Sequence, residues 1–98
     1  MAVELRPVVA VDGAREVIRL LRDHLPPDTK WSLEVRDGYE LMYHLTVYVA
    51  LENSWALREL VREYMADLMQ RGVTMVLLFG SPDVLAMHPD AEVFGLND

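Results

Sequence analysis

Residues 40–53 read ELMYHLTVYVALEN, and the alternation in this stretch decides which face of the chain is buried. The odd positions are apolar or aromatic: Leu41, Tyr43, Leu45, Val47, Val49 and Leu51. The even positions are mixed: Met42, His44, Thr46, Tyr48 and Ala50. Because successive strand side chains point to opposite faces, the stretch predicts a strand with its odd side chains in the core. The even side chains form a second face that is neither core nor ordinary surface and requires a contact of its own.

The rest of the composition indicates one globular domain. The chain has 98 residues, of which 52% are hydrophobic and 26% charged. We expect a single α+β domain over residues 1–89, followed by an acidic tail over residues 90–98 for which a sheet edge is one docking place. The chain has no cysteine, which excludes disulfides and favours a cytoplasmic setting. It has no signal-peptide pattern, and no apolar run approaches the roughly 20 residues of a membrane span.

The charge distribution argues against two classes of partner. The formal net charge is −7, and all nine Lys and Arg residues lie at or before Arg71. Nucleic acid and anionic membrane are disfavoured as partners, because contacts with phosphates need clustered cations. A basic protein partner is compatible with this balance.

The first part of the chain predicts a strand and then a helix. Residues 3–11 are predicted to form a strand that is regular from Val8, because Pro7 has no N–H to donate. Asp12 is the predicted N-cap of a helix. The apolar stripe of that helix is Val17, Ile18, Leu20, Leu21 and Leu25.

A hairpin is predicted to follow this helix. Trp31, Leu33 and Val35 alternate with polar residues, and Asp37-Gly38 is a turn signal. A three-residue loop of Arg36, Asp37 and Gly38 matches the apolar faces of the two strands. The predicted pairs are Val35–Tyr39, Leu33–Leu41 and Trp31–Tyr43.

The second half predicts another helix, a strand and a short helix. Asn53 or Ser54 caps the longer helix, and Gly72 ends it. Residues 73–79 form the last long strand. Ser81-Pro82-Asp83 begins a short helix that runs to about Met87.

The order βαββαβ fits an antiparallel four-stranded sheet in the order 4-1-3-2, with both long helices on one face. This is a ferredoxin-like two-layer α+β sandwich, with the short helix and the acidic tail added at its end. The fold hosts many unrelated functions, so the site has to decide the function.

The open face and the last strand are the predicted interface. Residues 73–79 are apolar on both faces, and a free edge strand of this kind favours aggregation unless something covers it. A second copy of the chain, a partner, or the segment with Val93, Phe94 and Leu96 could do so; the last of these would leave a plain monomer. The predicted interface residues are Met42, His44, Thr46, Tyr48, Val76, Leu78, Phe94 and Leu96.

Two classes of function remain open. The first is a non-enzymatic module that forms a homodimer or docks a protein partner through its sheet, for instance as an inhibitor or immunity-type protein against a basic surface. The alternative is a ligand sensor or a cofactor-free enzyme with a site lined by His44, Tyr48, Tyr43 and Trp55. His44 is the candidate base, but no second catalytic group can be assigned beside it. No cofactor or metal is expected, since His88, Asp90 and Glu92 match no strong ligand motif.

Overall fold

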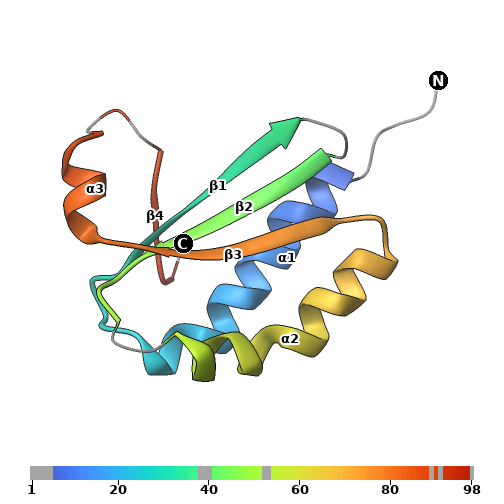
Figure 1. The fold of residues 1–98 in the computed structure, drawn as a ribbon, viewed down its shortest axis with the longest axis horizontal. Helices are drawn as coiled ribbons and strands as arrows, with labels where there is room; N and C mark the ends of the chain where they lie inside the picture. Colours follow the sequence, from blue (N-terminus) through green and yellow to red (C-terminus); the bar gives the residue numbers. More distant parts are fainter. Residues whose placement is uncertain (1–5, 38–40, 52–53, 89, 91, 98) are drawn as a thin grey trace.

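A computed structural model describes residues 6–37, 41–51, 54–88, 90 and 92–97. Two long helices lie side by side under one face of a sheet, and a short helix lies on its other side (Figure 1). The elements in chain order are α1 (Arg6–Leu21), η1 (Arg22–His24), β1 (Lys30–Asp37), β2 (Leu41–Tyr48), α2 (Trp55–Gln70), β3 (Thr74–Gly80), α3 (Pro82–Ala86) and β4 (Phe94–Gly95).

The strand predicted over residues 3–11 is wrong from Arg6 onward, where the chain is already helical. The fully or almost fully buried residues of α1 recur every three or four positions: Ala10, Ala14, Val17, Ile18 and Leu21. This is the spacing of one helical face. Pro7 is compatible with α1 because the first turn of a helix needs no N–H donor.

The sheet is mixed and has the strand order β3-β2-β1-β4. The predicted ferredoxin-like antiparallel sheet, in the order 4-1-3-2, is therefore wrong. Residues 6–21 are helical and contribute no strand, and β3 pairs parallel with β2, while β4 pairs antiparallel with β1. The α+β class itself is confirmed.

The two crossover connections run in opposite directions. The connection through α2 passes under one face from β2 to β3, and the connection through α3 returns over the other face from β3 to β4 (Figure 1). Opposite directions on opposite faces give the two crossovers the same hand, as the rule for parallel connections requires.

The hairpin register is also corrected. Trp31 pairs with Val47, Leu33 with Leu45 and Val35 with Tyr43, so each pairing is four residues further along β2 than predicted. Both registers match odd residues with odd residues, and face matching cannot distinguish them. Pairing extends to Asp37 and Leu41, and residues 38–40 lie outside the described residues.

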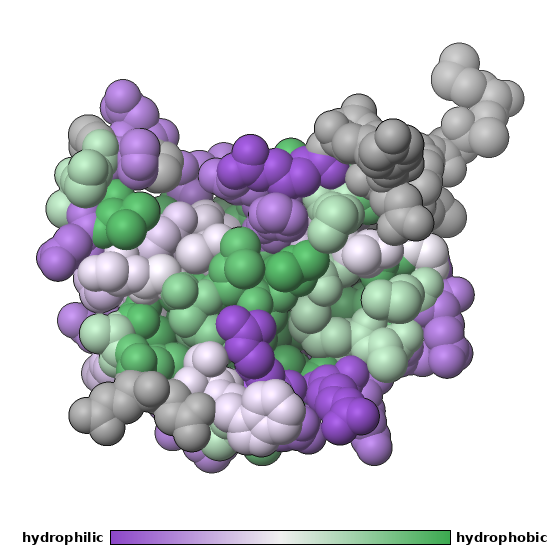
Figure 2. Space-filling view, in the orientation of Figure 1, coloured by the Kyte–Doolittle hydropathy of each residue, from purple (hydrophilic) through white to green (hydrophobic). Residues whose placement is uncertain are grey.

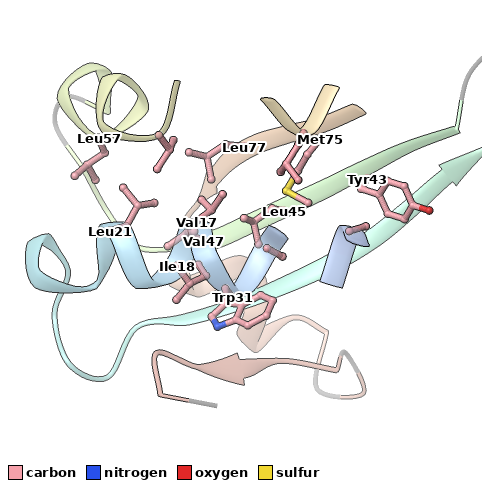
Figure 3. Packing of buried hydrophobic residues seen from close by; sticks show 14 of the residues in the cluster. Val17, Ile18, Leu21, Trp31, Tyr43, Leu45, Val47, Leu57, Met75 and Leu77 are labelled. Atoms are coloured by element: carbon pink, nitrogen blue, oxygen red, sulfur yellow. The ribbon is translucent and has the colours of Figure 1, made fainter. Parts of the chain in front are cut away.

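The odd side chains of β2 form the centre of the core, as predicted. Tyr43, Leu45 and Val47 are at most 2% exposed and face α1 and α2 (Figure 3). Val17 and Ile18 of α1 belong to the same core cluster and lie next to Val47 and Leu45 (Figure 3). The even side chains of β2 therefore point to the opposite face.

Several predicted helix ends are confirmed. Gly72 follows α2 with a φ of 88°, a conformation that glycine adopts without steric penalty. The Ser81 hydroxyl accepts a hydrogen bond from the Asp83 N–H at 3.2 Å, and Pro82 is the first residue of α3. Within the described ranges, no helix has the length and apolar character needed to cross a membrane.

Candidate functional site

The outer face of the sheet, turned away from α1 and α2, changes character from strand to strand. His44 lies between Val76 of β3 and Glu34 of β1, and Thr46 lies between Leu78 and Ser32. The face is therefore apolar along β3 and charged or polar along β1. Met42, His44, Thr46 and Tyr48 are each half-buried on it.

One end of this face is associated with α3. The Tyr48 hydroxyl is hydrogen-bonded to the Ser32 hydroxyl at 2.9 Å. A hollow of about 530 Å³ separates α3 from β1 and is lined by Tyr48, Glu34, Val84 and His88, among others. Tyr48 thus lies beside α3, while Met42, His44, Val76 and Leu78 lie further from α3 along their strands.

β3 is an edge strand of the sheet along its whole length. The Gly80 C=O accepts a hydrogen bond from the Val49 N–H at 2.9 Å, so the main chain of Gly80 faces the β2 side. Because main-chain groups alternate in direction along a strand, the N–H and C=O groups of Met75, Leu77 and Phe79 point outward. The Leu77 C=O at this edge accepts a hydrogen bond from Arg58.

Arg58 reaches the edge from the first turn of α2. Its Nη1 donates to the Leu77 C=O at 2.6 Å, and its Nε donates to the Ser54 hydroxyl at 3.3 Å. Its guanidinium carbon also lies 5.2 Å from the centre of the Phe79 ring, a cation–π distance. One side chain therefore occupies the middle of the open edge.

An apolar groove runs between this edge and α2. It has a volume of about 470 Å³ and is lined by Trp55, Arg58, Glu59, Val61, Arg62, Met65 and Leu77. Figure 2 shows a hydrophobic band between β3 and α2 with hydrophilic side chains over it. Trp55 is 65% exposed, although it is one of the largest apolar side chains in the protein. On the rim, Arg62 Nη1 and Glu59 Oε1 are 3.6 Å apart.

The C-terminal segment lies at the opposite edge of the sheet. Trp31 pairs with Phe94, the two rings lie 4.7 Å apart, and the Trp31 indole N–H donates to the Gly95 C=O at 2.9 Å. Leu96 is buried in the core. Phe94 and Leu96 therefore serve the chain's own fold, and this segment does not lie on β3.

The four residues of the predicted small-molecule site are separated. Tyr43 points into the core, and its hydroxyl has no hydrogen-bond partner among the described residues. His44 and Tyr48 lie on the outer face, while Trp55 lies in the groove beside α2. Of the described residues, no three His, Asp or Glu side chains are arranged to hold a metal ion.

The sequence reasoning did not identify Arg58 or the groove. Its available signal was Trp55 and Arg58 in the first turn of a helix whose buried residues are Leu57, Val61 and Leu68. That pattern places Trp55 away from the buried stripe but does not say which strand lies beside it. The parallel pairing of β2 and β3 was needed to place α2 next to the edge.

No family model matches this sequence, and comparisons with curated proteins and with solved structures also found no match.

Proposed function

We propose that this chain is a non-enzymatic, cytoplasmic protein-interaction module that forms a homodimer through the open edge of β3. One observation carries the proposal: a seven-residue edge strand is apolar on both faces, and the C-terminal segment lies elsewhere. Open apolar edges are templates for pairing with another strand. The lack of cysteine supports a reducing compartment.

The edge is self-complementary in its hydrogen-bonding pattern. The outward main-chain groups belong to Met75, Leu77 and Phe79, which are evenly spaced around Leu77. A two-fold axis at Leu77 pairs Leu77 with Leu77 of a second copy, and Met75 with Phe79 of that copy. Every outward N–H then meets an outward C=O, which is the requirement of an antiparallel ladder.

The exposed residues of α2 support the same symmetry. Trp55, Arg62 and Met69 are seven residues apart and lie close to one line along the helix. Trp55 is 65% exposed and Met69 is 60% exposed. If two α2 helices lie antiparallel with their midpoints together, each Trp55 meets Met69 of the other copy. Both apolar side chains are then covered.

Arg62 lies at the centre of this arrangement. It is midway between Trp55 and Met69, so the same antiparallel alignment brings Arg62 of one copy next to Arg62 of the other. Within each helix, Arg62 Nη1 lies 3.6 Å from Glu59 Oε1, and this carboxylate reduces the repulsion between the two guanidinium groups.

The test is a charge placed on the edge strand. Leu78 is 37% exposed on the outer face of β3, so Leu78→Lys introduces a cation at the proposed seam without emptying the core. Val84→Lys on α3, a site 45% exposed, is the matched control. We expect sedimentation velocity to find a dimer for the wild type and for Val84→Lys, and a monomer for Leu78→Lys.

Amide hydrogen exchange locates the interface within the sheet. The outward N–H groups of Met75 and Phe79 should exchange slowly in the dimer and fast in the Leu78→Lys monomer. A wild-type chain that stays monomeric at high concentration would refute the proposal. So would a dimer in which these two amides still exchange fast, because that dimer would use another surface.

A further inference from the structure

We infer that Arg58 is a latch that keeps the β3 edge closed in the monomer and has to be released before the edge can pair. This inference rests on the proposed edge-to-edge dimer. It adds a residue that limits how tightly the dimer forms. The same residue keeps the edge of the monomer from pairing with unrelated strands.

The latch occupies an acceptor that the ladder needs. With a two-fold axis at Leu77, the C=O of each Leu77 has to accept a hydrogen bond from Leu77 N–H of the other copy. In the monomer, Arg58 Nη1 holds that same C=O at 2.6 Å. A hydrogen bond from a charged donor is stronger than one from a neutral amide, so the exchange is unfavourable at this position. Two such bonds, one from each copy, oppose every dimer.

The position of Arg58 in α2 explains why its side chain lies on the strand. The first turn of a helix carries a partial positive charge, which gives no stabilisation to a cation. Arg58 is in this first turn, and its guanidinium contacts the Leu77 C=O, the Phe79 ring and the Ser54 hydroxyl. Two of these three partners belong to β3. The edge strand is thus what attracts the guanidinium.

The latch also accounts for an unusual edge. Proteins commonly protect edge strands with charged side chains placed over them. Here the strand itself provides no charge, because residues 74–80 read TMVLLFG. The protecting charge comes from the neighbouring helix, and it covers the central residue of the edge. Pairing of this strand with an unrelated strand is therefore penalised unless the wider surface of α2 contributes as well.

The experiment compares Arg58→Met with Arg19→Met by measuring the dimer dissociation constant. Methionine keeps an unbranched apolar side chain over Phe79 but removes the charge and the donors. Arg19 lies on α1, outside the proposed interface, and its ion pair is with Glu16, so Arg19→Met changes the net charge by the same amount. We expect Arg58→Met to lower the Kd by about tenfold to a hundredfold, as expected for freeing charge-assisted bonds. Arg19→Met should leave the Kd unchanged.

The outcomes separate this inference from the proposed function. If the wild type dimerises and Leu78→Lys prevents it, but Arg58→Met leaves the Kd unchanged or raises it, the latch is refuted and the edge interface stands. Equal tightening by Arg19→Met would also refute the latch, because the change in net charge alone would then be sufficient. If the wild type and Arg58→Met are both monomeric at every concentration, both ideas are wrong.

Discussion

Replacing Gly13 by alanine tests how closely α1 and α2 pack. Gly13 is in the middle of α1, where alanine would ordinarily stabilise the helix by about 1 kcal/mol. A Cβ at this position would lie 2.9 Å from both Cδ1 and Cδ2 of Leu68. Carbon atoms in contact prefer about 3.5–4.0 Å, so the added methyl group overlaps both branches of that side chain.

The surroundings of Leu68 decide the sign of the effect. Leu68 is fully buried, and rotating one methyl group away from Gly13 moves the other within a packed core. Overpacking of this kind costs about 1–3 kcal/mol. After subtracting the gain in helix propensity, we expect Gly13→Ala to lower the free energy of unfolding by about 1 kcal/mol.

Urea denaturation followed by circular dichroism measures this change. In a Leu68→Ala background the overlap is gone, so Gly13→Ala should there stabilise the protein by about 1 kcal/mol. Asp12→Ala, at an exposed neighbouring position of α1, is the control for helix propensity alone. If Gly13→Ala stabilises the wild type as much as it stabilises Leu68→Ala, the close packing of the two helices is wrong.

Three further predictions concern single contacts. Tyr43→Phe should raise the free energy of unfolding by about 1 kcal/mol, because it removes a buried hydroxyl without a described partner; a loss measured in urea would show that the hydroxyl is satisfied. Phe94→Ala should lower the free energy of unfolding by about 2 kcal/mol, because the contact with Trp31 is lost. An unchanged urea midpoint would mean that β4 adds no stability. The hydrogen bond from Arg19 lowers the pKa of Glu16 in the folded protein. The stabilisation from this contact is therefore present above the pKa that Glu16 has in the unfolded chain, and it is lost as the pH falls through the pKa that Glu16 has in the folded chain. NMR titration should find this pKa lowered in the wild type and normal in Arg19→Gln.

Local patterns predicted much of the secondary structure. The alternation in residues 41–48 gave the correct strand and the correct buried face, because a strand has a period of two whatever its neighbours are. The ends of α2 and α3 were predicted from Gly72, Ser81 and Pro82, whose effects depend on the adjacent backbone alone.

Residues 6–11 were predicted wrongly because their local signals conflict. Val8, Val9 and Val11 favour a strand, and Gly13 disfavours a continuous helix. The helical conformation is favoured by burial against the rest of the fold, and at Gly13 the absence of a side chain lets α1 approach Leu68 of α2 closely. That gain comes from a contact 55 positions away in the sequence, which no local pattern contains.

The candidate site was likewise predicted in part from local patterns and decided in part by tertiary packing. An apolar edge strand in need of a partner was predicted from residues 73–79 alone, since both of its faces are apolar. Which edge it forms, and the position of Arg58 over it, depended on the parallel pairing of β2 with β3. The hairpin register likewise changed by four residues without changing which side chains are buried.

Outside residues 6–11 and the C-terminal segment, then, the sequence by itself determined the period of the strands and helices, the buried face of β2 and of the long helices, and the end of α2 and the start of α3. Tertiary structure alone decided that residues 6–11 are helical, that β3 pairs parallel with β2, and that the C-terminal segment lies beside β1. The physical reason is that periodicity depends on neighbours within a few residues. Strand order and register depend on the packing of segments far apart in the chain, where several arrangements bury the same apolar side chains.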